Sequence, residues 1–364
     1  MYFFTQIIRT LVALTFIFSG FVKLVDPLGS VYKLEEYFSA DVLNLEFLVP
    51  YALLISLVLI FAELMFGVML LMGYRVKETV WSLFFLTLIF LFLTWYSAYY
   101  NKVTDCGCFG DALQLSPWET FYKNVILIGL IIFLLFKSFD IPPVLDDYAG
   151  YFTLTAFVVF SIIAYYSLKH LPIIDFRPYA EEKNIMEGML IPENAEKPVF
   201  EDIWIYNIDG ENKSFSTDEK PWNIPGATYV DRKTNVISEG YVPPIHDFTM
   251  EKDGEDLTEQ LLNEEKLMLI VMYNLSESKK RGLRKVAKLS EKALINGYHV
   301  YGFSASSEED FQNIKEEYGF NFDMLFCDET TLKTIIRSNP GIVIINKGTI
   351  TGKWSWRDTK KVKL

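Results

Sequence analysis

The sequence predicts a multi-domain protein in which an α-helical transmembrane bundle, of four spans plus a fifth, is followed by an α/β domain. Residues 1–170 contain 22 charged residues and residues 171–364 contain 58. The first half is therefore apolar enough for a membrane, whereas the second has the charge density of a water-soluble domain. In the second half, apolar runs alternate with amphipathic patterns, which is typical of βαβ units. A net charge of −12 argues against nucleic acid as a partner.

Five segments are apolar and long enough to cross a hydrocarbon core of roughly 30 Å at about 1.5 Å per residue. In the first of them, Arg9 and Lys23 lie where long side chains can reach the membrane surface. This segment also has some features of a cleaved signal peptide, but it lacks an A-x-A-like site, which favours a retained helix. The five segments are residues 7–25, 51–72, 79–100, 118–136 and 149–168.

The basic residues of the short loops predict the orientation. The loop GYRVKE carries Arg75 and Lys77 and is predicted to be cytoplasmic, whereas the acidic loop after the first span is predicted to be outside. Alternation then places residues 101–118, and everything after about residue 170, outside the cytoplasm. We therefore expect a multi-pass protein of the bacterial inner (cytoplasmic) membrane that contacts membrane lipid and has a periplasmic C-terminal domain.

The loop NKVTDCGCFGDALQLSPW (101–118) carries the one chemical motif, in which Cys106 and Cys108 are separated by Gly107. Two thiols this close favour redox exchange, because the second can resolve a mixed disulfide formed by the first. Gly107 permits the tight curvature that a C-x-C bridge needs, and Gly110 relaxes the next turn. The cysteines are therefore a candidate redox pair. A static structural bridge stays open, and so does half of a metal site, although no further ligand cluster is visible and we expect no metal.

Three acidic residues are candidate auxiliary groups. Asp105 and Asp111 flank the two cysteines in the same loop. Glu63 lies within the second span, where a carboxylate is costly and often functional. A proton or quinone role would explain Glu63, and so would hydrogen bonding inside the bundle. No cation lies near Glu63 in the sequence.

The motif and its setting resemble the MauE/DoxX group of redox-associated membrane proteins. The resemblance covers about residues 1–140 and implies a four-helix membrane domain there, with residues 141–170 as a fifth transmembrane helix. The group is loosely similar to quinone-linked thiol oxidoreductases, so the resemblance implies quinone as a candidate cofactor and a periplasmic thiol client as a candidate partner. The residues that carry it are Ser19-Gly20-Phe21-x-Lys23-Leu24-x-Asp26-Pro27-x-Gly29 and Asp105-Cys106-Gly107-Cys108-Phe109-Gly110-Asp111.

Residues 171–244 are predicted to be a linker and a small β-rich segment, and residues 245–364 an α/β domain. The order of elements in this domain resembles the thioredoxin-like fold, and Pro340 has the position at which that fold places its cis-proline. The expected elements are strand 267–273, helix 276–295, strand 299–306, helix 308–319, strand 323–328, helix 329–338 and a terminal hairpin.

The thioredoxin-like resemblance implies a redox pair directly after strand 267–273, where this chain has Asn274-Leu275-Ser276-Glu277. A thiol mechanism needs a thiolate, so we expect a catalytically inactive docking domain. Cys327 is expected to line the core. Three functions stay open for the whole chain. The first is thiol–disulfide or quinone-linked electron transfer through Cys106 and Cys108. The second is a non-enzymatic scaffold or maturation factor with a structural C-x-C clip, and the third is a small-molecule or lipid-handling bundle.

Overall fold

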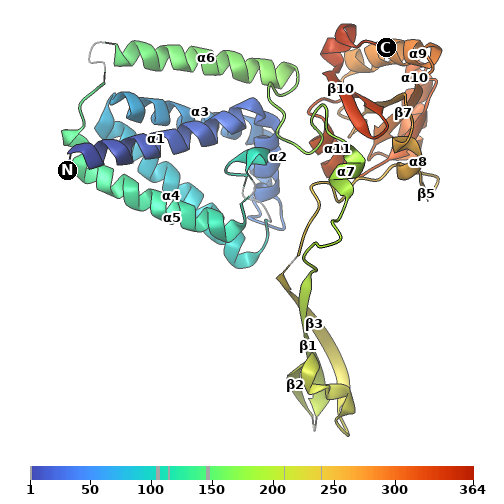
Figure 1. Ribbon diagram of the computed structural model, residues 1–364, viewed down its shortest axis with the longest axis horizontal. Coiled ribbons are helices and arrows are strands. Elements are labelled where there is room, and N and C mark those ends of the chain that lie inside the picture. Colours follow the sequence, from blue (N-terminus) through green and yellow to red (C-terminus); the bar gives the residue numbers. More distant parts are fainter. Residues whose placement is uncertain (1, 104–106, 114, 145–147, 209, 239) are drawn as a thin grey trace.

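The computed structural model describes residues 2–364 except 104–106, 114, 145–147, 209 and 239 (Figure 1). In this described part, five helical segments are long and apolar enough to cross a membrane, which confirms the predicted bundle with a fifth span. The last of them, α6, lies along α3 and α1 and buries few of its side chains. The five are α1 (Tyr2–Val25), Glu46–Met72, which includes α3 (Ala52–Met72), α4 (Val76–Tyr100), α5 (Pro117–Lys137) and α6 (Ala149–Lys169).

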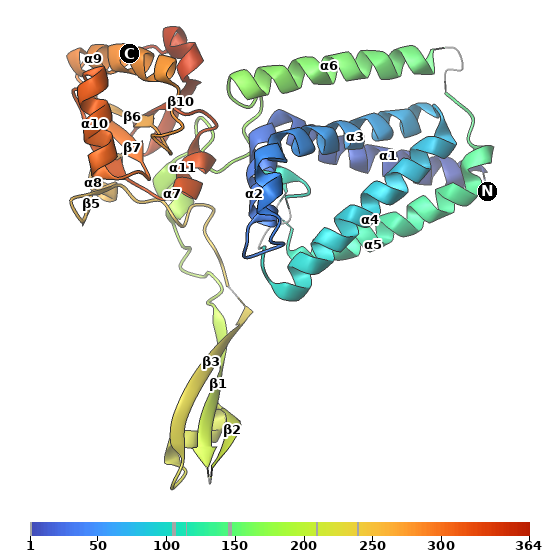
Figure 2. The same ribbon diagram turned by 180° about the vertical axis from the view of Figure 1, so that it is seen from behind.

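Local signals set the ends of the spans. Ser116 begins α5 with a capping box, because its side chain accepts from the Glu119 N–H while the Glu119 carboxylate accepts from the Ser116 N–H. Gly73 ends α3 with a left-handed φ of 68°. The two views agree that residues 27–38, labelled α2, and the C-terminal half lie at the opposite end of the bundle from the N-terminus (Figure 2).

A short helix, α2 (Pro27–Phe38), lies across that end of the bundle, in a stretch that the sequence predicted only as an acidic loop. Asp26 caps it by accepting from the Gly29 N–H at 3.1 Å, and Pro27 suits the first turn. Tyr37 and Phe38 are buried against the start of α3. Tyr32, on another face of α2, contacts Tyr273 of the C-terminal half.

A seven-stranded sheet of order β10-β9-β6-β7-β8-β4-β5 forms the centre of the C-terminal part. β6, β7 and β8 are parallel, whereas β9 and β10 form the predicted antiparallel end. All five residues of β6 are buried, as expected for a strand covered on both faces. The strands are β4 (Glu251–Lys252), β5 (Glu255–Asp256), β6 (Leu267–Val271), β7 (His299–Ser304), β8 (Asp323–Phe326), β9 (Gly341–Asn346) and β10 (Thr349–Ser355).

Alternate residues of β6 enter two hydrophobic cores, one on each face of the sheet. Met268 and Ile270 pack with the helices α9 and α10, while Leu267 and Leu269 pack with α8, α11 and the short helix α7. This arrangement confirms the predicted alternation of strands and helices. The helices are α7 (Ile185–Met189), α8 (Thr258–Leu262), α9 (Lys280–Ile295), α10 (Glu308–Tyr318) and α11 (Glu329–Ile335).

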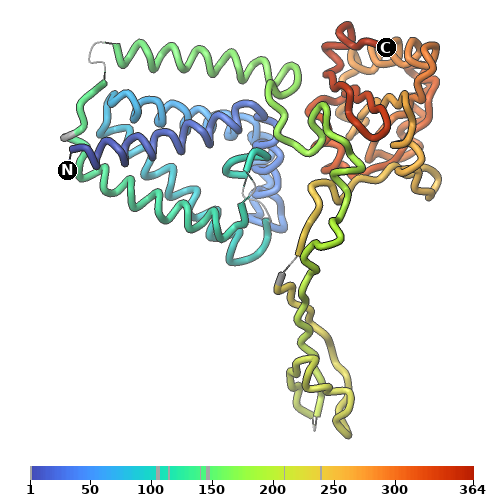
Figure 3. Tube along the Cα trace, viewed as in Figure 1, coloured from blue at the N-terminus to red at the C-terminus, as the bar shows by residue number. Residues whose placement is uncertain are grey.

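The β-rich segment forms a separate three-stranded antiparallel sheet of order β2-β1-β3. Its strands are β1 (Val199–Ile208), β2 (Glu211–Ser216) and β3 (Thr228–Ser238). They project from the C-terminal part as an arm (Figure 3). The arm leaves and returns at one place, because the Tyr241 N–H donates to the Glu196 carbonyl at 2.9 Å.

A buried charge cluster, which we call the linker cluster, fixes the linker after α6 to the sheet. It consists of Asp175, Arg177 and Lys353, whose cations both donate to the one carboxylate. Arg177 donates from Nε to Asp175 Oδ1 at 2.7 Å and from Nη2 to Oδ2 at 2.9 Å. Lys353 of β10 donates to Asp175 Oδ2 at 2.7 Å and to the Tyr179 carbonyl at 2.8 Å.

The two cations of the linker cluster compete for a single negative charge. Burial, together with the neighbouring guanidinium of Arg177, lowers the pKa of Lys353 to about 7. Burial opposes ionisation of Asp175, but Arg177 and Lys353 outweigh it and lower the pKa of that carboxyl to about 2. The cluster therefore contains a carboxylate at neutral pH and a lysine that loses its proton near neutrality.

Candidate functional site

The Cys-x-Cys loop lies at the end of the bundle, packed against α1, α2 and α5. Cys106 and Asp105 lie outside the described residues. Cys108 is a free, half-buried thiol, and its backbone carbonyl accepts from Ser19 Oγ of α1 at 2.7 Å. Phe109 is buried, and the Lys123 Nζ of α5 lies 4.3 Å from its ring centroid. These contacts hold the loop against two spans.

The two loop glycines have backbone conformations that other residues rarely adopt. Gly107 has a φ of 64° and Gly110 a φ of 50°, which is the left-handed region that favours glycine. A Cβ on Gly107 would lie 3.0 Å from the Lys33 side chain of α2, and one on Gly110 would lie 3.1 Å from Val22 of α1. Glycine therefore permits both the turn and its close approach to the helices.

Glu63 forms an ion pair inside the bundle. Lys23 Nζ lies 2.6 Å from Glu63 Oε1, and the two side chains are 11% and 1% exposed, respectively. Lys23 also donates to Ser19 Oγ at 3.1 Å. The Lys23 ammonium is thus paired with a carboxylate that is buried in the apolar bundle.

A cavity of about 70 Å³, which we call the bundle cavity, lies beneath the loop between α1, α2, α3 and α4. Cys108, Lys23, Ser56 and Glu63 are among the residues that line it. Glu63 Oε2 and Ser56 Oγ are buried and have no hydrogen-bond partner among the described residues. The bundle cavity therefore places a thiol-bearing residue, an ion pair and two unsatisfied oxygens around one small space.

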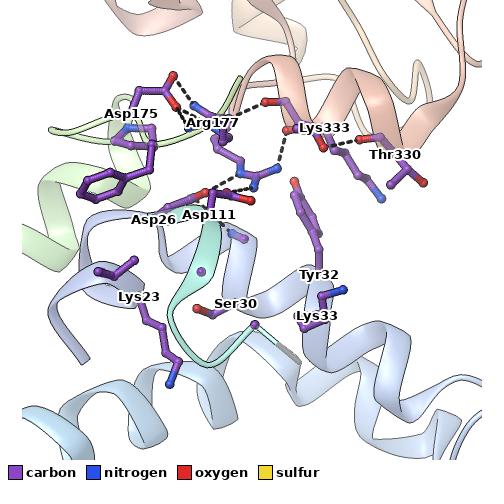
Figure 4. A pocket seen from close by; sticks show the side chains of 18 of the residues that line it. Lys23, Asp26, Ser30, Tyr32, Lys33, Asp111, Asp175, Arg177, Thr330 and Lys333 are labelled. Atoms are coloured by element: carbon purple, nitrogen blue, oxygen red, sulfur yellow. Dashed lines mark hydrogen bonds and ion pairs between the residues drawn. The ribbon is translucent and has the colours of Figure 1, made fainter. Parts of the chain in front are cut away.

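The C-terminal part contacts the loop through Arg337, whose side chain is 6% exposed. Its Nε donates to Asp26 Oδ2 at 2.8 Å, and its Nη2 lies 3.7 Å from Asp111 Oδ2 (Figure 4). Burial lowers the pKa of Arg337, but Asp26 and Asp111 outweigh that effect and raise it. One buried cation thus joins the cap of α2, the Cys-x-Cys loop and the C-terminal part.

A larger cleft of about 500 Å³, which we call the junction cleft, lies between the membrane part and the C-terminal part. At its edge the Tyr32 hydroxyl of α2 donates to the Tyr273 hydroxyl at 3.3 Å. Lys23 and Gly107 line both the junction cleft and the bundle cavity. The loop therefore lies between a cleft outside the bundle and a cavity within it.

Residues 274–277 lie beside Pro340, at the carboxyl end of β6. The Asn339–Pro340 peptide bond is cis. Asn339 donates from Nδ2 to the Asn274 carbonyl at 2.7 Å, and its Oδ1 accepts from Ser278 Oγ at 2.7 Å. Amides and a hydroxyl occupy this place, and none of the four residues is a cysteine.

Cys327 is fully buried among the core residues on one face of the sheet. Burial raises the pKa of its thiol to about 11, which disfavours the reactive thiolate. The prediction that Cys327 lines the core is confirmed.

Sequence reasoning found the loop but missed the partners that surround it. Glu63 and Lys23 lie 40 residues apart on different helices, so no local pattern joins them. The available signal was the four-residue spacing of Ser19 and Lys23, which places both on one face of α1. Asp26 and Arg337 belong to separate halves of the chain, and no sequence signal connects them.

Comparison with known proteins yields one match. Residues 1–137 match the family model described as "Methylamine utilisation protein MauE". Comparisons with curated proteins and with solved structures give no match. The matched residues comprise α1 to α5 and include the Cys-x-Cys loop, Lys23 and Glu63. The chain is thus a multi-pass membrane protein whose first 137 residues are similar to the MauE family.

Proposed function

We propose that the protein is a membrane redox protein that exchanges disulfides with an extracytoplasmic thiol client through Cys106 and Cys108. The observation that carries the proposal is the position of Cys108, half-buried on a loop between the junction cleft and the bundle cavity. The similarity of residues 1–137 to the MauE family, together with the resemblance to redox-associated membrane proteins in the same residues, also supports the proposal.

The proposed exchange balances without a further reactant. A dithiol client attacks the Cys106–Cys108 disulfide, and a mixed disulfide forms first. The second client thiol then resolves it, so that the loop S–S bond breaks, a client S–S bond forms, and two protons and two electrons pass to the loop. The reverse direction oxidises the loop pair and reduces a client disulfide.

A quinone-linked route fits the bundle cavity poorly. An engineered apolar cavity of about 150 Å³ accommodates a benzene ring, whereas the bundle cavity measures about 70 Å³. The bundle cavity by itself is therefore too small for a quinone ring, and the exchange that we propose does not use one. Thiol–disulfide exchange is accordingly the form of redox activity that we propose.

We further propose that residues 245–364 form a thioredoxin-like docking domain without its own thiol pair. Before it, the chain forms a membrane domain at 1–140, a fifth span at 141–170 and a linker with the arm at 171–244. The parallel strands β6 to β8, with Pro340 beside residues 274–277, support this assignment. The first of these domains is of the MauE/DoxX type.

The basic loop at Arg75 and Lys77 supports a periplasmic location for the Cys-x-Cys loop and the C-terminal domain. Reporter fusions after Ile185 are expected to be active only with a reporter that works outside the cytoplasm. Activity of a reporter that works only in the cytoplasm would show that the chain has the opposite orientation.

Trapping tests the exchange directly. With Cys108→Ser or Cys106→Ser, the loop has no second thiol to resolve a mixed disulfide formed by the first. The mixed disulfide should therefore accumulate on non-reducing gels and disappear on reduction. Cys327→Ser is the matched control and should change nothing, since that thiol is buried. Absence of any adduct from either single variant, with a pair that stays oxidised in every redox buffer, would exclude exchange.

One observation favours a second function, a scaffold or maturation factor in which the C-x-C motif is a structural clip. Arg337 joins Asp111 of the loop to the C-terminal part, as a structural joint would. A pair potential well below about −300 mV is typical of structural bridges. The scaffold would be favoured by such a potential if, in addition, the double Ser variant of Cys106 and Cys108 fails to accumulate.

A further inference from the structure

We propose that Glu63 is the proton acceptor for the Cys108 thiol, with Lys23 as the charge partner of Glu63 and the bundle cavity as the path between thiol and carboxylate. The inference rests on the proposed thiol exchange and deepens it. It starts from the unequal use of the two carboxylate oxygens. Oε1 accepts from Lys23 at 2.6 Å, whereas Oε2 is buried without a partner among the described residues.

The unsatisfied oxygens indicate what the cavity contains. Glu63 Oε2 and Ser56 Oγ are both unsatisfied, and both residues line the bundle cavity. Buried polar atoms are normally hydrogen-bonded, and one water needs about 10–15 Å³ of such space. A cavity of about 70 Å³ therefore has room for a few waters that satisfy both oxygens. Because Cys108 lines the same cavity, these waters connect its side of the cavity to the carboxylate.

Two hydrogen bonds hold the loop over this path. Lys23 Nζ donates to Ser19 Oγ at 3.1 Å, and Ser19 Oγ in turn donates to the Cys108 carbonyl at 2.7 Å. The ammonium of Lys23 is therefore tied to the carboxylate on one side and to the backbone of Cys108 on the other.

Charge conservation explains why a base inside the bundle is useful. When the Cys108 S–H proton passes through cavity water to Glu63, the negative charge moves from the carboxylate to sulfur, while Lys23 stays positive. The site has the same net charge before and after, so no new charge is created in a low-dielectric interior. The thiolate then attacks a disulfide, one sulfur leaves as a thiolate, and the proton on Glu63 returns to that leaving group.

The test uses the full chain in lipid nanodiscs with Cys106→Ser and Cys327→Ser, so that Cys108 is the remaining thiol. The probe is dithiodipyridine, a small neutral disulfide whose release of thiopyridone reports the rate across a range of pH. Adding Glu63→Gln is expected to lower the rate at neutral pH about tenfold or more. The rates should converge at alkaline pH, because hydroxide can then accept the proton in place of Glu63.

Glu46→Gln is the matched control, since Glu46 is an exposed carboxylate just before α3 and lines neither the bundle cavity nor the junction cleft. It is expected to stay within about twofold of the parent at every pH. A Glu63→Gln profile that superimposes on the parent profile overturns the proposal.

If Glu63→Gln fails to accumulate because it leaves Lys23 unpaired, the double variant Lys23→Met with Glu63→Leu carries the test, since it removes both charges together. The same loss of rate at neutral pH is expected, and a parental rate would overturn the proposal. The labelling reaction needs no client. Failure of the proposed function would therefore appear as a missing client adduct, and failure of this inference as an unchanged labelling profile.

Discussion

Two buried charge clusters in this molecule differ in how completely their hydrogen bonds are satisfied. In the linker cluster, both oxygens of Asp175 accept from cations, and Lys353 donates to a carboxylate and to a carbonyl. In the bundle, Glu63 Oε2 and Ser56 Oγ have no partner among the described residues, and their residues line a cavity. The linker cluster thus satisfies its own buried charges, whereas the bundle pair leaves one carboxylate oxygen facing a cavity that has room for water.

The lowered pKa of Lys353 illustrates this difference. A lysine that loses its proton near neutrality is a feature of many active sites. Here, however, burial and the neighbouring Arg177 account for the shift, and the amine is held by Asp175 and Tyr179. A perturbed pKa is therefore a weaker sign of function in this chain than an unsatisfied oxygen beside a cavity.

The largest expected effect tests whether the linker cluster is structural. Asp175→Ala leaves two buried cations without their carboxylate and should destabilise the C-terminal part by about 3–5 kcal/mol. Chemical denaturation of the full chain, monitored by pulse proteolysis of the C-terminal part, measures it. Glu265→Ala is the matched control, because it removes a carboxylate from an exposed pair with Lys347 and should change little. Equal losses in the two variants would contradict a structural role.

The next prediction concerns the stability of the bundle pair. Lys23→Met alone leaves a buried carboxylate and should lower the free energy of unfolding of the bundle by about 3 kcal/mol, whereas adding Glu63→Leu should recover most of it. The aggregation temperature of the solubilised protein reports both effects. A double variant as unstable as the single would show that the pair, like the linker cluster, is needed for folding.

Arg337 bridges the two regions, so its replacement tests whether they are held together. Arg337→Gln leaves Asp26 and Asp111 without their cation and should weaken the junction by about 1.5–3 kcal/mol, the range for hydrogen bonds to charged groups. Faster amide hydrogen exchange in α2 and at the linker is expected. Lys347→Gln, at an exposed pair that does not line the junction cleft, is the control. Unchanged exchange in α2 would argue that Arg337 does not hold the two regions together.

The smallest expected effect is a pH dependence of stability. The pKa of Lys353 is lowered from 10.5 to about 7 in the folded chain. Between these values the unfolded chain binds the proton and the folded chain does not, so stability rises with pH across this window. The gain from pH 7 to about pH 8 should be about 1 kcal/mol. Lys353→Met should remove this slope, and a slope that persists in the variant would assign it to another group.

Local patterns predicted most of the fold but only part of the site. The spans and strands follow from runs of apolar residues, and the Cys-x-Cys loop from a spacing of two residues. Helix α2 was missed because Gly29 and the mixed charges of its sequence obscure the helical period. The Lys23–Glu63 pair and the Arg337 contacts were missed because each joins residues that only the tertiary fold brings together.

The arm of β1, β2 and β3 has a consequence for how this molecule can diversify. Its entry and exit are hydrogen-bonded neighbours at Glu196 and Tyr241, so lineages can lengthen, exchange or lose it without displacing the linker or the sheet. On the arm, the Trp204 ring makes edge contacts with the rings of Trp222 and Tyr229. The length and composition of the arm can therefore change without altering the buried contacts at the membrane.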